Sequence, residues 1–134
     1  MKITGIDHIH VYVEDIEQAE RWYKEVLGFS RDESLFFWFE QGGPLVIKNN
    51  GASLSLFPRD CQEPGHTMAF GVGASALAGL ISVLTERQIS FIVCDHEVSM
   101  SVYFSDLSSN KIEVTSYEYS YARKILDNPN CMSY

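Results

Sequence analysis

Basic residues are scarce in this chain of 134 residues, which has 10 lysines and arginines against 18 aspartates and glutamates. The formal net charge is therefore −8. Nucleic acids and anionic membranes are repelled by a surface that is acidic on average. We expect neither of them as a partner.

Cysteine is also scarce, and its three residues, Cys61, Cys94 and Cys131, are odd in number and widely spaced. No two of them have the spacing of a zinc finger or a redox motif, so we expect no disulfide framework and a reducing compartment. The amino-terminal residues also lack the positive charge followed by an apolar run that marks a signal peptide. The sequence therefore predicts a cytoplasmic protein.

Long hydrophobic runs are lacking as well. The stretch 64–85 contains no charged residue and is long enough to cross a bilayer, but glycines and other small or polar residues interrupt it. We interpret it as strand, turn and helix. With 46% hydrophobic residues, the chain is suited to one domain with a substantial core.

The stretch 6–29 is typical of one strand followed by one helix. Residues alternate across a strand, so Ile9, Val11 and Val13 would share one face, and His8, His10 and Tyr12 the other. The first face is apolar and predicts a core contact. The second face carries the groups that could do chemistry.

The helix that follows has clear start and stop signals. Asp15 is placed to act as N-cap with Gln18 at capping-box spacing, and Gly28 has the position of a left-handed C-terminal cap. Apolar residues recur between them at spacings of three and four, which indicates a stripe that packs against a sheet.

This strand–helix unit recurs later in the chain. Alignment of His8 with His66 gives an offset of 66 − 8 = 58, and the strand-like segments 53–57 and 111–115 have the same offset. We therefore expect an α+β fold of two βαβββ modules whose curved mixed sheet encloses a cleft. The predicted single domain consists of module one at 1–58, module two at 64–119 and a tail at 120–134.

Further elements complete the two modules. In module one, residues 33–40 and 45–48 flank a glycine-rich turn and predict a hairpin whose aromatic run, 36–39, contributes mainly to the core. In module two we expect a helix at 75–87 and strands at 91–94, 101–104 and 111–117, followed by a short helix at 120–126 that 127–130 should end.

Polar residues on the first and last strand of each module form one candidate site. The positions related by the offset are His8, Ser55, His66 and Glu113. Two imidazoles and one carboxylate suit a divalent ion with open coordination positions, and such an ion is catalytic. We therefore predict that His8, His66 and Glu113 bind one ion of Mn, Ni, Fe, Co or Zn.

Several motifs carry a resemblance to a known family over roughly residues 3–117. They are Ile6-Asp7-His8-Ile9, Leu27-Gly28-Phe29, Gly65-His66-Thr67-Met68-Ala69-Phe70, Tyr103-Phe104-Ser105-Asp106 and Asn110-Lys111-Ile112-Glu113-Val114. With them the chain resembles the vicinal oxygen chelate superfamily, which includes glyoxalase I, extradiol dioxygenases and bleomycin-resistance proteins. In length and ligand set it looks most like the fosfomycin-resistance enzymes. The resemblance implies the same three metal ligands and a homodimer.

The resemblance also suggests roles for other residues. Tyr103 and Ser101 resemble residues near the substrate of the fosfomycin thiol transferases, which implies a catalytic role for Tyr103 and a substrate contact for Ser101. Arg123 lies close to their phosphonate-binding arginine, which implies that it binds substrate. His10 follows the first ligand by two residues and is predicted to act as a base, a substrate donor or a partner of a ligand. Ser55 replaces the carboxylate that glyoxalase I needs, which argues against glyoxalase activity and leaves Ser55 as a substrate contact.

Three functions are compatible with this sequence. The preferred one is a metal-dependent enzyme whose ion acts as a Lewis acid on a small substrate chelated through two oxygens, by thiol addition, isomerisation or hydrolysis. The alternative is a metal-free protein that sequesters a small molecule, like the bleomycin-resistance proteins. The third is an extradiol dioxygenase, since its iron uses the same ligand set.

Overall fold

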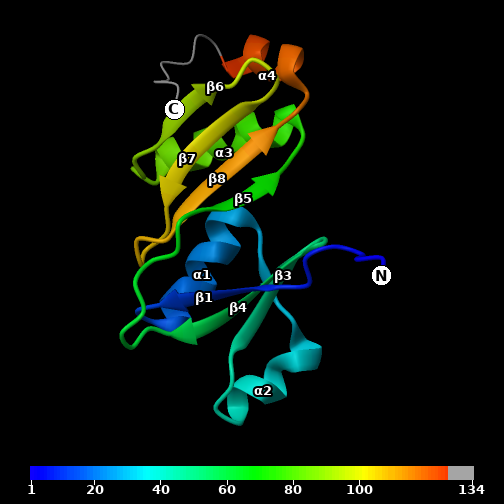
Figure 1. The fold of residues 1–134 in the computed structure, drawn as a ribbon. Helices are drawn as coiled ribbons and strands as arrows, with labels where there is room; N and C mark the ends of the chain where they lie inside the picture. The colour runs from blue at the N-terminus through cyan, green and yellow to red at the C-terminus, as the bar shows by residue number, and fades with distance from the viewer. Residues whose placement is uncertain (127–134) are drawn as a thin grey trace. The chain divides into compact units, whose positions relative to one another are not determined.

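The computed structural model describes residues 1–126, and contacts among its Cα atoms divide the chain into two compact units. The first unit spans Met1–Pro64 and the second begins at Gly65. Each unit contains one four-stranded mixed sheet, and each is described by itself below (Figure 1). The single-domain interpretation remains a prediction.

The first unit has the predicted order of strand, helix and three strands. Its elements are β1 (Ile9–Val13), α1 (Ile16–Leu27), β2 (Ser30–Arg31), a 3-10 turn η1 (Glu33–Leu35), α2 (Phe36–Glu40), β3 (Leu45–Asn49) and β4 (Ala52–Pro58). The strand order in the sheet is β1-β4-β3-β2, with β1 parallel to β4 and the other pairs antiparallel.

The second unit repeats this topology. Its elements are β5 (Met68–Gly71), α3 (Ala74–Glu86), β6 (Ile92–Asp95), β7 (Met100–Ser105), β8 (Lys111–Ser116) and α4 (Tyr119–Leu126). The strand order is β5-β8-β7-β6, again with the first and last strands parallel. Figure 1 shows α3 against one face of this sheet. The prediction of an α+β fold with two βαβββ modules is confirmed.

The predicted helix signals of α1 are present. The Asp15 carboxylate accepts the backbone N–H of Gln18 at 2.9 Å, and Gly28 adopts the left-handed conformation at φ 72°. A side chain at Gly28 would be strained by this φ and would approach the Asn49 amide at 3.2 Å. The buried stripe of α1 consists of Ala19, Trp22, Tyr23 and Val26.

The predicted hairpin at 33–40 is wrong, because this segment forms η1 and α2. The edge position beside β3 is taken instead by Ser30–Arg31. The Asp32 carboxylate caps η1 at the Ser34 N–H, and Gly43 N donates to Trp38 O at 2.7 Å to close α2. None of the α2 aromatic residues is buried, so the expectation that they mainly form core is also wrong.

The remaining predictions on the chain have mixed outcomes. The helix at 120–126 is confirmed as α4, whereas its end at 127–130 and the rest of the tail lie outside the described residues. Cys61 is an exposed free thiol, but Cys94 in β6 is disulfide-bonded, which the sequence did not predict. No helix among residues 1–126 is long and apolar enough to cross a membrane.

Candidate functional site

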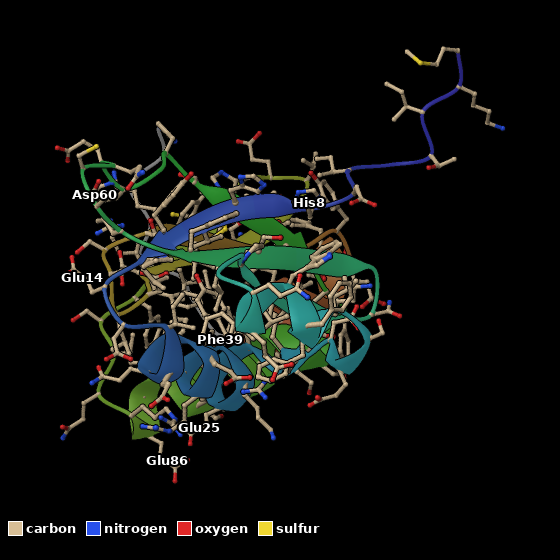
Figure 2. All side chains as sticks on the ribbon, turned by 90° about the horizontal axis from the view of Figure 1, so that it is seen from below. His8, Glu14, Glu25, Phe39, Asp60 and Glu86 are labelled. Carbon is tan, nitrogen blue, oxygen red and sulfur yellow. The ribbon has the colours of Figure 1, made fainter. Side chains whose placement is uncertain are left out.

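Two histidines mark the amino-terminal end of β1. His8 directly precedes the strand, and Figure 2 shows it at the end of β1 opposite Glu14. Residues two apart in an extended chain point to the same side, and His8 and His10 accordingly stack with ring centroids 5.0 Å apart. Their Nε2 atoms lie 3.1 Å apart. The predicted chemical face of the first strand therefore brings these two rings together.

The His8 imidazole is oriented by its neighbour in the chain. Its Nδ1 lies 2.8 Å from the Asp7 carboxylate. A carboxylate can only accept here, so Nδ1 must carry the proton, and a neutral His8 ring then keeps its lone pair on Nε2. This is the tautomer in which Nε2 can bind a metal ion.

A cavity of about 670 Å³ opens beside these histidines within the first unit. Its lining includes His8, His10, Trp38, Lys48 and Ser55. Ser55 is the β4 partner of His10 in the sheet, so both side chains point to one face, although Ser55 is only 4% exposed. The Lys48 ammonium is paired with the Asp32 carboxylate at 2.8 Å, which raises the pKa of Lys48.

The sheet registers correct the predicted alignment of the first strands by one residue. Ser55 in β4 pairs with His10, whereas Glu113, 58 residues after Ser55, pairs with Ala69. The offset between β1 and β5 is thus 69 − 10 = 59. Thr67 therefore occupies the position that matches His8 on this register.

The burial of β5 agrees with this register. Met68 and Phe70 are half-buried and pair with the core residues of β8, while Ala69 and Gly71 are exposed. The predicted alignment would instead have placed Ala69 and Gly71 in the core. His66 lies in a bend before β5, so strand alternation does not fix the direction of its side chain.

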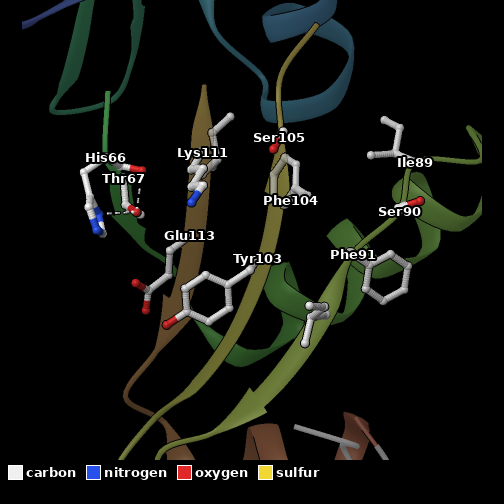
Figure 3. A pocket seen from close by; sticks show the side chains of 12 residues that line it. His66, Thr67, Ile89, Ser90, Phe91, Tyr103, Phe104, Ser105, Lys111 and Glu113 are labelled. Atoms are coloured by element: carbon white, nitrogen blue, oxygen red, sulfur yellow. Dashed lines mark hydrogen bonds between the residues drawn. The ribbon is translucent and has the colours of Figure 1, made fainter. Parts of the chain in front are cut away.

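A second cavity, of about 850 Å³, lies within the second unit. His66, Tyr103, Lys111 and Glu113 are among its lining residues, together with apolar side chains such as Phe91. In Figure 3 the His66 ring, the Glu113 carboxylate and the Tyr103 hydroxyl point toward the same side. Two of the three predicted metal ligands therefore open onto one cavity.

Thr67 fixes the tautomer of His66. The Thr67 hydroxyl donates to the His66 carbonyl at 2.7 Å, and the same oxygen lies 3.0 Å from His66 Nδ1. Because the hydroxyl proton is already used, this oxygen must accept from Nδ1–H. Nε2 of a neutral His66 then carries the lone pair, as in His8. No residue among 1–126 hydrogen-bonds to His66 Nε2.

The Glu113 carboxylate is held by a buried hydroxyl. Ser101 is fully buried, and its Oγ donates to Glu113 Oε2 at 2.8 Å and lies 2.9 Å from Thr115 Oγ1. Glu113 Oε1 has no hydrogen-bond partner among the described residues. This geometry supports Ser101 as a residue that positions Glu113, while its predicted contact with substrate stays a prediction.

Sequence reasoning missed His96, which contacts a predicted catalytic residue. Its Nε2 lies 3.0 Å from the Tyr103 hydroxyl, and Tyr103 in turn is the β7 partner of Glu113. His96 lies in the turn between β6 and β7, outside the strand pattern and without a counterpart in the first module. Only its distance of seven residues from Tyr103 across a hairpin could have indicated the contact.

Arg123 is not among the residues that line the second cavity. It forms an ion pair with Asp95 on β6, and the Tyr119 hydroxyl donates to the same carboxylate oxygen at 3.1 Å. The Glu97 backbone N–H, followed by Tyr119 and Arg123, lowers the pKa of Asp95. The observed contacts give Arg123 a structural role, and its predicted binding of substrate remains a prediction.

The structure thus brings the predicted residues together in two groups. His8, His10 and Ser55 lie in the first unit, and His66, Tyr103, Glu113 and Ser101 in the second. No group of three or more histidine, cysteine, aspartate or glutamate side chains among residues 1–126 is arranged to hold a metal ion. Convergence of His8 with His66 and Glu113 therefore stays a prediction.

Comparisons with known proteins agree with the observed topology. A family model for the Glyoxalase/Bleomycin resistance protein/Dioxygenase superfamily matches residues 5–114. No match was found among curated proteins. Similar solved structures include a lactoylglutathione lyase from Agrobacterium tumefaciens, with 21% identity, a TM-score of 0.68, and coverage of 87% of this chain and 96% of that one.

Two further structures are similar in fold. A virulence protein from Salmonella typhimurium has 24% identity and a TM-score of 0.66, with 87% of this chain and 99% of that chain covered. The oxidase ChaP-H2 has 16% identity and a TM-score of 0.73, with 91% and 99% covered. At these identities the likeness establishes the fold and leaves the reaction open.

Proposed function

Since the chain belongs to the glyoxalase/bleomycin resistance protein/dioxygenase superfamily, we propose that it is a metal-dependent enzyme. In this proposal His8, His66 and Glu113 bind one divalent ion of Mn, Ni, Fe, Co or Zn. The substrate is a small molecule that presents two neighbouring oxygens to the ion. Thiol addition, isomerisation and hydrolysis are all reactions that such an ion assists.

The observation that carries this proposal is the common tautomer of the two histidines. Asp7 holds Nδ1 of His8, and Thr67 holds Nδ1 of His66, so each ring offers Nε2 as a ligand. Metal-binding histidines commonly donate their other ring nitrogen to such a partner. Two histidines remote in sequence thus share an arrangement that suits a metal ion. Two imidazoles and one carboxylate also fit the divalent ion that membership of this family implies.

The carboxylate supports the same proposal. Ser101 fixes one oxygen of Glu113 and leaves the other available at the wall of the second cavity. Two imidazole nitrogens and one carboxylate oxygen leave coordination positions open. A bound divalent ion would supply Lewis acidity toward a substrate oxygen.

The remaining lining residues have roles that follow from their chemistry. The Tyr103 hydroxyl, hydrogen-bonded to His96, is placed to exchange a proton with a substrate atom in the cavity. The Lys111 ammonium favours an anionic part of the substrate. Apolar side chains of the cavity wall, such as Phe91 and Ile92, offer contacts to an apolar part of the substrate.

A metal-free binding protein is the second candidate. It is favoured by the register of β5, which places Thr67 rather than His66 at the position that matches His8. In this function the cavity of about 850 Å³ holds a small ligand directly, and its volume falls within the range of small-molecule sites.

A thermal-shift experiment separates the two candidates. The melting temperature of the purified protein is measured with Mn, Ni, Fe, Co and Zn added in turn, because an ion that binds only the folded state stabilises it. The enzyme proposal predicts a rise that is lost in Glu113→Gln and kept in Glu86→Gln, a change at an exposed position of α3. Equal melting temperatures with and without every ion would favour the metal-free protein.

We also propose a homodimer, which rests on the resemblance of the sequence to fosfomycin-resistance enzymes and is measured by light scattering after size-exclusion chromatography. A cytoplasmic location is proposed from the three widely spaced cysteines of the sequence. The disulfide at Cys94 weighs against a strongly reducing compartment, so fractionation of cells is the direct test.

A further inference from the structure

We infer that His8 and His10 together chelate one divalent transition metal, which makes His10 a metal ligand rather than a base beside the site. This inference rests on the proposed metal function in sharing His8 and its ion. It needs no contribution from His66 or Glu113, because both nitrogens belong to β1 and its preceding residue. The ions that we expect to bind are those intermediate between hard and soft, such as Zn, Ni or Co, because they prefer imidazole ligands.

The separation of the two nitrogens has the value that a chelate requires. The Nε2 atoms lie 3.1 Å apart, and a metal–imidazole bond is about 2.0–2.1 Å long. One ion placed at that distance from both nitrogens subtends an N–metal–N angle of about 98°. This angle lies between those of octahedral and tetrahedral sites. The hydrogen bond directs both nitrogens along the line that joins them, so each ring must turn to direct its lone pair at the ion.

Both rings are held in this arrangement by neighbours. Asp7 accepts from His8 Nδ1 at 2.8 Å and so directs the His8 lone pair toward His10. The His10 ring packs between two aromatic surfaces, with His8 at 5.0 Å and Phe57 at 4.7 Å between centroids. An ion that binds there meets two nitrogens that already lie close together, on rings that remain exposed to solvent.

In the protein without metal, one proton lies between the two rings. Because the lone pair of His8 lies on Nε2, the hydrogen bond at 3.1 Å requires His10 to donate from its own Nε2. When an ion binds, this proton must leave Nε2. It moves to Nδ1 of the same ring, and His10 then offers its Nε2 lone pair while remaining neutral. Binding thus converts one tautomer of His10 into the other.

The surroundings leave room for further ligands. The same residues line the cavity of about 670 Å³, with Ser55 beside His10 on the neighbouring strand. The lining also contains Lys48, whose ammonium group is paired with the Asp32 carboxylate. Water or substrate oxygens can therefore complete the coordination without direct opposition from an unpaired cation.

The test is a titration of the full chain with Zn²⁺, which is diamagnetic, followed by calorimetry and by 15N–1H spectra of the imidazoles. We expect the His10 signals to change from the Nε2–H to the Nδ1–H pattern as one ion binds. His10→Ala should weaken binding by more than the roughly 10–100-fold that loss of an outer partner costs, and Asp7→Asn by about that amount. Glu86→Gln, at an exposed position of α3, serves as the control variant.

Three further variants, His8→Ala, His66→Ala and Glu113→Gln, distinguish this inference from the proposed function. Loss of affinity in both His8→Ala and His10→Ala supports the chelate. If affinity is also lost in His66→Ala and Glu113→Gln, the three-ligand site holds on the same ion, whereas unchanged affinity in those two variants contradicts the three-ligand site and leaves the chelate standing. Unchanged affinity and an unchanged His10 tautomer, with loss in His66→Ala, overturn the chelate and leave the proposed site standing. Absence of binding to the wild-type chain overturns both. The spectra are recorded on the wild type, so the test does not depend on a variant that folds.

Discussion

Removal of the Ser101 hydroxyl tests how the Glu113 carboxylate is positioned. Ser101→Ala deletes one hydrogen bond of 2.8 Å to a carboxylate, and a hydrogen bond to a charged group contributes about 1.5–3 kcal/mol. Glu113 is only partly buried, so water can replace some of this interaction. We therefore expect the free energy of unfolding to fall by about 1.5 kcal/mol, at the lower end of that range.

The same variant should weaken metal binding. If Ser101 orients Glu113 as a ligand, its loss reduces metal affinity by roughly 10–100-fold, the usual effect of removing an outer partner. Urea unfolding gives the stability, and calorimetric titration gives the affinity. Ser105→Ala is the matched control, because Ser105 lies on the same strand and is exposed. If Ser101→Ala equalled the wild type in both measurements, the assigned role of Ser101 would be refuted.

Three other predictions concern the fold. Asp15→Ala removes the α1 cap and should cost about 1 kcal/mol in thermal or urea unfolding; no change would contradict the cap. The Glu97 backbone N–H lowers the pKa of Asp95 from its ordinary value of 3.8. The ionised Asp95 therefore stabilises the fold above pH 3.8, and this contribution is lost as the pH falls through the lower pKa of the folded state. Asp95→Asn should thus destabilise at pH 7 and differ less from wild type in acid, whereas a constant difference would exclude this linkage. Ile112→Ala in the core should lower the free energy of unfolding by about 2–5 kcal/mol. The exposed Leu107→Ala should lower it by less than about 0.5 kcal/mol, and equal losses in the two variants would contradict the assignment of Ile112 to the core.

Local signals with a direct physical cause were predictable from the sequence. The α1 cap at Asp15 and the left-handed Gly28 follow from backbone groups at helix ends that need partners. The duplicated topology followed from two segments that share one offset, because strands with the same apolar pattern bury the same face. The helix signals lie within a few residues of each other, whereas the duplication is detected by comparing segments 58 residues apart.

Features that depend on competition between segments were not predictable. The run 36–39 is apolar and aromatic, which does not distinguish a short helix from a strand, and the helix forms because Ser30–Arg31 takes the strand position. The alternation of residues in the sequence also did not predict the one-residue shift of β5. His66 gave a better match to His8, whereas in the sheet the half-buried Met68 and Phe70 pair with core residues of β8.

The amount of metal bound per chain tests the central claim most directly. The protein is purified without chelator or metal-affinity column, and its metal content is measured by elemental analysis, with His66→Ala and Glu113→Gln beside it. The account predicts about one equivalent of Mn, Ni, Fe, Co or Zn in the wild type, and a clear loss in both variants. A wild-type chain that contains no such metal, and takes up none after dialysis against each ion, would contradict the proposal that this protein is a metalloenzyme.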